Sequence, residues 1–429
     1  MSKNKILWSS DGSILPNIEP HTKAKHHIFE DYVSDWILTL CGNNMGKKKT
    51  VTLIDGFCGG GMYYDENHQL WYGSPIRLIK AVEKGLERVK RDKSKPDYEL
   101  NVKYIFIDNK QSHIDCLKKQ MRESGLDKYL NDPNLCIFIC EDFEVIANKI
   151  MTNIKKRKGS SLFILDPCGY TDVSMQTIRK IVGLQKTEII YTYMIDFIRR
   201  FIKERKGSQK NAFNNILEAS GYYELANLEK NIYSQQEYLR NETLRLFRDR
   251  GQAPYVYSFA LLQTQRLVTY YLIHLANSPT AQKVIKNSLW IHNTMNLSYQ
   301  FNYDVYGMGF RSPDFYNFNQ RLFDINDANE RTAIENLNDD VMKYVHGVEQ
   351  IEFGALHIDT MQFNPATAKH YEIFIDEQRD AGELEVLRDG KRTKARNLKS
   401  TDIIARPKYK QLRIFDINKY RNLIKDNIK

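Results

Sequence analysis

The chain alternates between short apolar runs and longer stretches that place apolar residues at helical spacing. The apolar runs cover residues 51–55, 102–108, 134–140, 161–170 and 187–195. Strands that alternate with helices predict a parallel sheet with right-handed crossovers, and strands this uniformly apolar predict burial on both faces. We therefore expect an α/β fold with a Rossmann-like, mostly parallel sheet at its centre.

Two further apolar runs, residues 254–263 and 269–276, follow a charged segment at about 199–250. We interpret the two runs as a hairpin-like pair that gives the sheet an antiparallel edge. The charged segment has helical spacing and is interpreted as an insertion. A first domain of residues 1–295 would contain all of these elements.

The pattern changes beyond residue 295. Residues 296–350 are rich in Asn, Asp and Tyr and predict a connecting segment with one helix. Residues 351–429 predict two helices and then a hairpin that turns at Asp389-Gly390, because Asp-Gly is preferred in two-residue hairpin turns. This order resembles a winged helix, and we expect a last strand at 408–416.

The composition is that of a globular protein with a basic surface. The 429 residues are 42% hydrophobic and carry a formal net charge of +10. This charge favours a polyanionic partner, either nucleic acid or an acidic protein, although ordinary solubility also accounts for it. No apolar stretch approaches the roughly 20 residues that span a bilayer, and the N-terminus has no signal-peptide core. We expect a cytoplasmic protein without membrane contact.

Six cysteines are present, and none forms a CxxC pair. We expect reduced, mostly buried thiols, without a zinc site or a disulfide framework. The histidines and lysines near residue 21 also lack acids or cysteines at ligand spacing, so no metal site is predicted there.

The run VTLIDGFCGGG, residues 51–61, ends in an acid and a glycine-rich loop. Glycines permit positive φ and close approach of a ligand to the backbone, but a lysine-containing phosphate loop is absent. Ser74 and Pro75 then predict a helix start, with Ser74 as N-cap. Because ligands of parallel sheets bind at the carboxyl ends of the strands, the acids that end successive strands predict a site there. These acids are Asp55, Asp108, Asp142 and Asp166.

The acids suit different parts of one ligand. Asp108 suits a ribose, because a carboxylate accepts both hydroxyl hydrogens. Asp142 suits the amine of an adenine, with Phe143 stacking on the ring, and Asp166-Pro167 suits chemistry on a substrate. NAD also fits in part, but the spacing from Gly61 to Asp108 is far longer than its fingerprint requires. This arrangement is the one that S-adenosylmethionine (AdoMet) methyltransferases use.

Several motifs resemble a known family as a set. DGFCGGG is similar to the D-x-F-x-G-x-G motif of nucleic-acid methyltransferases, and DPCGY is similar to their D/N-P-P-Y motif. With IEPHTKAKHH, similar to H-T-x-x-K-H, and with GSP and LDPCG, the set resembles the three-Cys-motif partner (TcmP) family. The resemblance spans roughly residues 18–295. It implies a methyltransferase-like fold, AdoMet as cofactor and a partner protein with three cysteines.

The resemblance also implies roles by position. The methionine part of AdoMet would lie against the first motif, the ribose on Asp108, and the adenine on Asp142 and Phe143. Asp166, Pro167 and Tyr170 would face the methyl acceptor. The second Pro of the fourth motif is replaced, and its aromatic residue is displaced by one position. The first-motif residues are Asp55, Gly56, Phe57, Gly59 and Gly61.

Two segments near the predicted site allow two interpretations each. The tyrosine-rich insert 62–72 is either a solvent loop or a lid over the cofactor. His21 and Lys23 either begin a helix that caps the sheet or face the pocket, where Lys23 would neutralise the AdoMet carboxylate, as the resemblance implies.

Two basic segments are candidate contacts for nucleic acid. The cluster at 199–206 is either a target-recognition element or a solvated helix face. The winged-helix-like segment either contacts phosphates or docks a protein, and phosphate contacts would add affinity without sequence readout. Its candidate residues are Lys369, Arg388, Lys391, Arg392, Lys394 and Arg396.

The leading hypothesis is an AdoMet-dependent methyltransferase that acts on nucleic acid. The alternative is a catalytically silent Rossmann-like scaffold that binds nucleic acid and a partner protein. A nucleotide hydrolase or an NAD enzyme is disfavoured by the absent phosphate loop.

Overall fold

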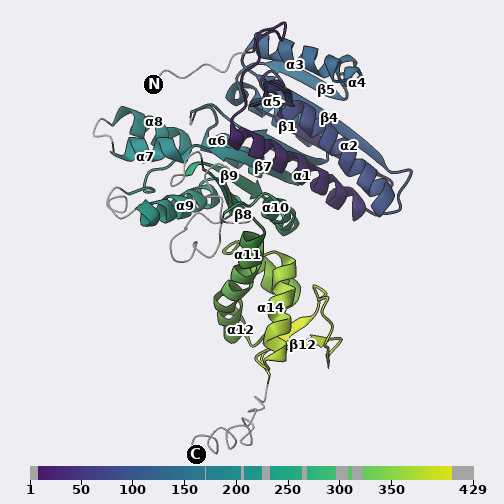
Figure 1. The fold of residues 1–429 in the computed structure, drawn as a ribbon, viewed down its shortest axis with the longest axis vertical. Helices are drawn as coiled ribbons and strands as arrows, with labels where there is room; N and C mark the ends of the chain where they lie inside the picture. The colour runs from purple at the N-terminus through teal and green to yellow at the C-terminus, as the bar shows by residue number, and fades with distance from the viewer. Residues whose placement is uncertain are drawn as a thin grey trace, which may run out of the picture. The chain divides into compact units, whose positions relative to one another are not determined.

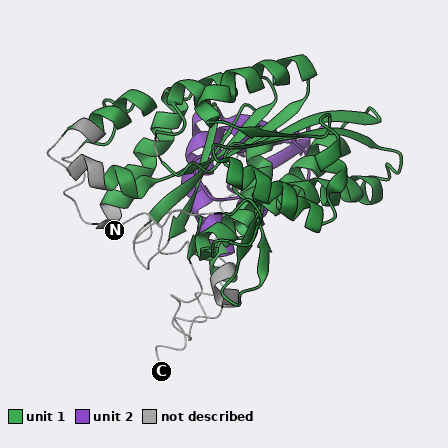
Figure 2. Ribbon diagram, turned by 90° about the horizontal axis from the view of Figure 1, so that it is seen from above, with its two compact units in different colours: residues 1–329 green, residues 330–429 purple. Residues whose placement is uncertain are grey.

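The computed structural model describes residues 8–169, 171–203, 207–224, 232–262, 268–295, 308–311 and 322–407. The chain divides into two compact units, which Figure 2 shows in different colours. Unit 1 comprises residues 1–329 and unit 2 comprises residues 330–429. The division falls within the segment that the sequence predicts as a connection.

Unit 1 is an alternating α/β structure (Figure 1). Its strands are β1 (Lys48–Asp55), β2 (Met62–Tyr64), β3 (Leu70–Tyr72), β4 (Glu99–Asp108), β5 (Cys136–Cys140), β6 (Ser160–Leu165), β7 (Thr187–Tyr193), β8 (Tyr255–Leu262), β9 (Val268–Ala276) and β10 (Gly309–Arg311). Its helices are α1 (Pro20–Gly42), α2 (Ser74–Asp92), α3 (Gln111–Glu123), α4 (Asp127–Asn131), α5 (Phe143–Arg157), α6 (Met175–Val182), α7 (Ile195–Lys203), α8 (Ser208–Leu217), α9 (Ile232–Asp249) and α10 (Pro279–Ile291), while α11 (Leu322–Leu337) continues into unit 2.

The central sheet has eight strands in the order β10-β8-β9-β7-β6-β1-β4-β5. Strands β5, β4, β1, β6 and β7 pair in parallel. Strand β9 is antiparallel to both of its neighbours, β7 and β8. These pairings confirm the predicted Rossmann-like, mostly parallel sheet and its antiparallel part. They also place β9 between β7 and β8, so the strand that follows β8 in sequence lies further inside the sheet.

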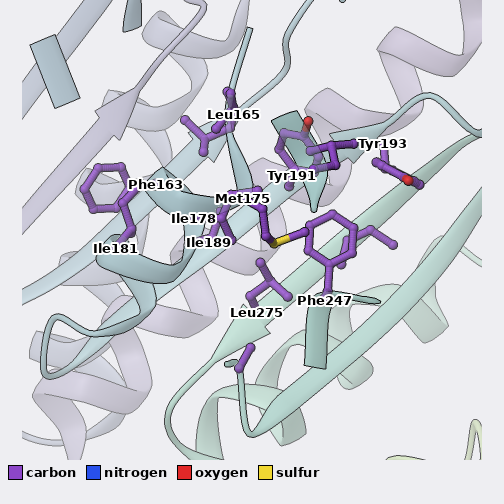
Figure 3. Packing of buried hydrophobic residues seen from close by; sticks show 14 of the residues in the cluster. Phe163, Leu165, Met175, Ile178, Ile181, Ile189, Tyr191, Tyr193, Phe247 and Leu275 are labelled. Carbon is purple, nitrogen blue, oxygen red and sulfur yellow. The ribbon is translucent and has the colours of Figure 1, made fainter. Parts of the chain in front are cut away.

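The sheet is buried on both faces because its central strands alternate between two apolar layers. In β6, Leu162 and Ile164 belong to the core shared with α1, α2, α3 and α10. Phe163 and Leu165 belong to the core shared with α5, α6 and α9. Figure 3 shows the second layer, where Phe163 and Leu165 lie with side chains of α6 and β7. Every residue of β6 and β7 is buried, as the uniformly apolar runs predict.

The segments around the sheet match the sequence expectations in part. The insertion after β7 forms the helices α7, α8 and α9. The tyrosine-rich insert forms a small antiparallel hairpin, β2–β3, in which Tyr63 pairs with Trp71. The sequence did not predict these strands, since three-residue strands leave almost no periodic signal.

Unit 2 combines helices with a small antiparallel sheet in the order β11-β14-β12-β13. The hairpin turns at the predicted pair, with φ of +52° at Asp389 and +74° at Gly390. The predicted strand at 408–416 lies outside the described residues. The elements are a π-helical turn (Asn338–Met342), α12 (Lys343–Val348), β11 (Gln350–Glu352), α13 (Phe353–Thr360), α14 (Ala368–Asp380), β12 (Glu385–Arg388), β13 (Lys391–Arg392) and β14 (Ile403–Ala405).

Candidate functional site

Four acids lie along the carboxyl edge of neighbouring strands. Asp55 ends β1 and Asp108 ends β4, while Asp166 follows β6 directly and Asp142 lies two residues beyond β5. Because these strands are adjacent in the order β5-β4-β1-β6, the acids share one edge, as the sequence predicts. Asp55 and Asp166 flank the point where the chain order reverses, which is where parallel sheets bind ligands.

Asp55 is buried at this edge and has internal hydrogen-bond partners. Its side chain accepts a hydrogen bond from Ser74 Oγ at 2.6 Å and one from the backbone N–H of Phe57 at 3.2 Å. Burial raises the pKa of Asp55 to about 7, although the bond from Ser74 opposes the shift. The sequence predicts Ser74 as the N-cap of α2, but Gly73 occupies that position. The hydroxyl of Ser74 instead donates to Asp55.

The glycine loop is closely covered by the chain itself. Gly59 and Gly61 have φ of +59° and +74°, a region that favours glycine. A Cβ on Gly60 would lie 2.2 Å from Trp8 Cγ, and one on Gly61 would lie 2.4 Å from Leu117 Cδ1. The indole of Trp8 is fixed by a 2.6 Å hydrogen bond to the carbonyl of Met62. The glycines therefore serve internal packing, whatever ligand the edge also holds.

Gly56 is constrained from the other side of the loop. A Cβ there would lie 2.7 Å from Leu165 Cδ2 and 3.0 Å from Phe143 Cδ2. Phe143 is only 2% exposed, and its ring packs near Phe57 and Phe163. The ring proposed to stack on adenine is thus part of the core in this structure.

Asp108 joins β4 to the glycine loop and to α3. Its Oδ2 accepts a hydrogen bond from Gly59 N at 3.1 Å, and its Oδ1 accepts one from Lys110 N at 2.9 Å. His113 Nδ1 also lies 2.9 Å from Oδ1. A carboxylate has about four acceptor positions, so these neighbours leave room for roughly one further donor.

Asp142 is the most accessible of the four acids. It is exposed at the start of α5, where it is the N-cap residue. Its Oδ1 accepts a 2.8 Å hydrogen bond from Asn109, which follows Asp108. The two loops after β4 and β5 are therefore linked at a point that an incoming donor can reach.

Asp166 forms an ion pair with Lys25, which the sequence analysis did not select. Lys25 is buried in the first turns of α1, while Asp166 is partly exposed. Lys23 instead pairs with Glu66 in the β2–β3 loop. The signal for Lys25 was available, because the lysine of the quoted H-T-x-x-K-H pattern falls on Lys25 and not on Lys23.

His21 lies in the same neighbourhood. Its ring stacks on Tyr270 of β9, with centroids 5.0 Å apart. Burial and the nearby charge of Lys25 lower the pKa of His21 to about 4, so it is neutral at pH 7. His21 is therefore a weak base at neutral pH.

The β2–β3 hairpin is tied to α1 and to the N-terminal segment. Tyr64 exchanges backbone hydrogen bonds with Pro16 and Ile18. Trp71 donates from Nε1 to His26 Nδ1 at 3.1 Å. The insert is therefore a folded hairpin tied to α1 and to the N-terminal segment, while its residues 66–70 are exposed to solvent.

The loop after Asp166 is partly described. Cys168 is exposed as a residue, but partial desolvation of its thiol and the nearby charge of Asp166 raise the pKa of that thiol. Gly169 N donates to Asp172 at 2.8 Å, which bends the loop after Pro167. Tyr170 lies outside the described residues.

The candidate cations of unit 2 differ in their contacts. Arg388 donates to both oxygens of buried Asp402, at 2.8 and 2.6 Å, and so holds the fold together. Arg392 lies 2.6 Å from Glu385, and Lys369 lies 3.8 Å from Glu330. The other three predicted cations are exposed on the hairpin and the following loop: Lys391, Lys394 and Arg396.

The helix that the sequence suggests for recognition is acidic on balance. Lys369 and Arg379 on α14 are outnumbered by four acids, and Arg379 is paired with Asp376 at 2.8 Å. An acidic helix disfavours close approach to phosphates. The four acids are Glu372, Asp376, Glu377 and Asp380.

Other site types find little support in the described part of the chain. There, no cluster of His, Cys, Asp and Glu is arranged to hold a metal ion. None of the described helices combines the length and the apolar character needed to cross a bilayer. In the basic cluster at 199–206, Arg199 pairs with Asp196, and residues 204–206 lie outside the described residues.

Comparisons with known proteins give no family. No protein-family model and no curated protein matches the chain. A solved structure from Clostridium thermocellum assigned as an rRNA-methylase aligns at 12% identity and a TM-score of 0.27, covering 60% of this chain and 98% of that one. One from Rhodobacter sphaeroides assigned as a Zn-dependent alcohol dehydrogenase aligns at 12% and 0.21, covering 61% and 100%.

A third structure, loganic acid methyltransferase with SAH, aligns at 8% identity and a TM-score of 0.24, covering 90% of this chain and 97% of that one. Similarities of this size carry no information about function. The fold assignment rests instead on the strand order and directions of the sheet.

Proposed function

We propose that unit 1 binds AdoMet and transfers its methyl group to nucleic acid. The observation that carries the proposal is the row of acids on the carboxyl edge of β5, β4, β1 and β6. Each strand end offers a carboxylate at a position where a parallel sheet binds its ligand. The reversed strand β9 beside β7 agrees with this reading, since an antiparallel edge is typical of the methyltransferase fold.

The chemistry of the edge suits the cofactor. Asp108 retains acceptor capacity for a ribose hydroxyl, and exposed Asp142 can accept from the adenine amine. The loop of Gly56, Gly59 and Gly61 would lie beside the methionine part. Phe57 is the partly buried ring beside this loop, whereas Phe143 is covered. AdoMet, when bound, supplies a methyl group on a positively charged sulfur.

The chain's own residues would position the acceptor. The partly exposed carboxylate of Asp166 would accept a hydrogen bond from an amine of the base and orient its lone pair. Lys25 fixes Asp166 in place. Asp166 or solvent would take the proton that the acceptor loses, since His21 is a weak base at neutral pH. Positioning of this kind accounts for much of the rate in a direct transfer.

The acceptor and partner assignments extend this proposal. The net charge of +10 and the exposed cations of the unit 2 hairpin support nucleic acid as acceptor. We propose that unit 2 is a winged-helix-like module that contacts phosphates through its hairpin and not through α14. A three-Cys-motif protein is proposed as partner on the sequence resemblance alone.

The silent scaffold is a second candidate, favoured by two contacts at the edge. Lys25 already pairs with Asp166, and Trp8 already covers Gly59 and Gly60. A protein that only binds nucleic acid and a partner would need neither the carboxylate of Asp166 nor the glycine loop to be accessible.

AdoMet binding separates the two candidates. We expect calorimetry to detect AdoMet binding to the full chain, and Asp142→Ala to weaken it about ten-fold or more, since bonds to a charged acceptor contribute about 1.5–3 kcal/mol. Asp142 is preferable to Asp108 for this test, because Asp108 also holds Gly59 and Lys110. Glu123→Ala, an exposed acid on α3, is the control. Absence of binding by the unchanged protein, with and without duplex DNA or RNA, would exclude the enzyme.

Transfer to an acceptor is the second part of the test. Radiolabelled AdoMet should label DNA or RNA in the presence of the full chain, and Asp166→Asn should reduce the labelling rate more than the AdoMet affinity. Binding without any labelling would favour the scaffold.

A further inference from the structure

The amino edge of the central sheet, opposite the acids, gathers three basic segments. Residues 47–49 lead into β1, residues 155–158 end α5 and lead into β6, and Lys186 leads into β7. Strands β1, β6 and β7 are adjacent and parallel, so their starting ends lie side by side. The amino-edge lysine patch comprises Lys47, Lys48, Lys49, Lys155, Lys156, Lys158 and Lys186.

The strand register brings the segments into contact range. Val51 pairs with Ser160, and Ser161 pairs with Thr187. Gly159 lies so close to Thr50 that a Cβ would be 2.5 Å from the carbonyl oxygen of Thr50. Neighbouring strands lie about 4.8 Å apart. Lysine runs that are more than a hundred residues apart in sequence thus form one surface.

The patch is exposed and lacks compensating charge of its own. Lys47, Lys48, Lys155, Lys156, Lys158 and Lys186 are exposed, and Lys49 is half-buried. The segments 44–50, 153–160 and 183–187 contain no acidic residue, and Glu188, which follows the last of them, is buried and accepts hydrogen bonds from Tyr32 and Trp36. Lys48 lies 3.4 Å from Glu99 of β4, and both side chains remain largely exposed. Pairs this exposed are weak and are easily exchanged for another anion.

Helix dipoles explain only part of this arrangement. Lys155 and Lys156 lie in the last turn of α5, where cations are favoured. Residues 47–49 begin five residues beyond the end of α1, and Lys186 is not in a helix. Their gathering therefore calls for an anionic partner with several charges.

We propose that the amino-edge lysine patch binds the phosphate backbone of double-stranded nucleic acid. The three segments contain no aromatic residue on which an unpaired base would stack, which disfavours single strands. A row of lysines without base-reading groups gives affinity that does not depend on sequence. The patch lies on the edge opposite the acids, so this binding goes beyond the proposed methyl transfer and does not require AdoMet.

Salt-dependent binding of a 30-base-pair DNA duplex tests the proposal. The variant Lys48→Gln/Lys156→Gln/Lys158→Gln is compared with Lys84→Gln/Lys128→Gln/Lys149→Gln, which removes as many positive charges from exposed lysines elsewhere in unit 1. We expect the first variant to lose affinity at least ten-fold and to have a log–log salt slope that is shallower by about 2 to 3, since each phosphate contact contributes about 0.9. The control variant should keep the slope of the unchanged protein.

Each other outcome overturns the proposal. Equal slopes in both variants would mean that the affinity comes from general charge, and a single strand bound as tightly as the duplex would contradict the backbone geometry. Binding to phosphatidylserine vesicles that is lost in the patch variant, with duplex binding unchanged, would assign the patch to lipid. Calorimetry with AdoMet on the same variants tests the methyltransferase separately, because the patch variant should bind AdoMet as the unchanged protein does.

Discussion

Lys25 and Asp166 form an ion pair that joins α1 to the loop after β6, across 141 residues of sequence. The side chain of Lys25 is 6% exposed, whereas that of Asp166 is 31% exposed. The lysine therefore depends on Asp166 to compensate its charge, while the carboxylate still reaches solvent or a substrate. This asymmetry fixes the N-terminal helix at the carboxyl edge and leaves the acid available.

The asymmetry predicts unequal costs of substitution. Asp166→Asn leaves a buried lysine without its counter-ion and should lower the free energy of unfolding by about 3 kcal/mol or more. Lys25→Met leaves a partly hydrated carboxylate and should cost about 1 kcal/mol. Urea unfolding of both variants and of the double variant measures the coupling. Equal single costs that add in the double variant would contradict the pairing.

Substitutions of Trp8 and Gly60 should also have coupled effects on the free energy of unfolding, because the two residues are in close contact. Gly60→Ala places a methyl group against the indole and should destabilise unit 1 by about 1–3 kcal/mol. Trp8→Ala removes a buried ring and should cost about 3–5 kcal/mol. In the double variant the methyl group has space, so its added cost should nearly vanish, as measured by urea unfolding. A glycine loop held open for a ligand alone would give additive costs.

The buried carboxyl of Asp55 predicts a pH dependence of stability. Its pKa of about 7 in the folded chain is higher than the value near 4 of an unfolded aspartate, so the folded state binds the proton more tightly. The stability from this group is complete below pH 4 and is lost as the pH rises from about 4 to 7. Unfolding free energies between pH 5 and 8 should therefore fall less steeply in Asp55→Asn than in the unchanged protein. Parallel curves would show that Asp55 titrates normally.

In the hairpin of unit 2, we expect different residues to stabilise the fold and to bind nucleic acid. Arg388→Ala breaks a two-point contact with buried Asp402 and should lower the thermal midpoint of unit 2. Lys391→Gln/Lys394→Gln should leave the midpoint unchanged and weaken duplex binding, with a shallower salt slope. Scanning calorimetry and binding titrations on both variants check this. If neither variant loses affinity for the duplex, protein docking becomes the better assignment for this unit.

Local pattern determined the elements and the edge on which the site lies. Each apolar run from Val51 to Tyr193 became a strand because the runs are short and rich in β-branched and aromatic residues, and runs that are apolar at nearly every position suit a strand covered on both faces. Parallel strands separated by helices then bring Asp55, Asp108, Asp142 and Asp166 to one edge. Asp389-Gly390 fixed its turn in the same way, since both residues accept positive φ.

Partners that are distant in sequence were decided only by the tertiary structure. The H-T-x-x-K-H pattern selects Lys25 but does not identify its partner: Lys23 and Lys25 lie on different sides of α1, and packing places Lys25 against Asp166 and Lys23 against Glu66. Trp8 on Gly60, Arg388 on Asp402 and the joined lysine runs at residues 47–49 and 155–158 depend in the same way on register and crossing geometry. Sequence patterns carry the periodicity of each element, but which side chains meet is set by how the elements pack.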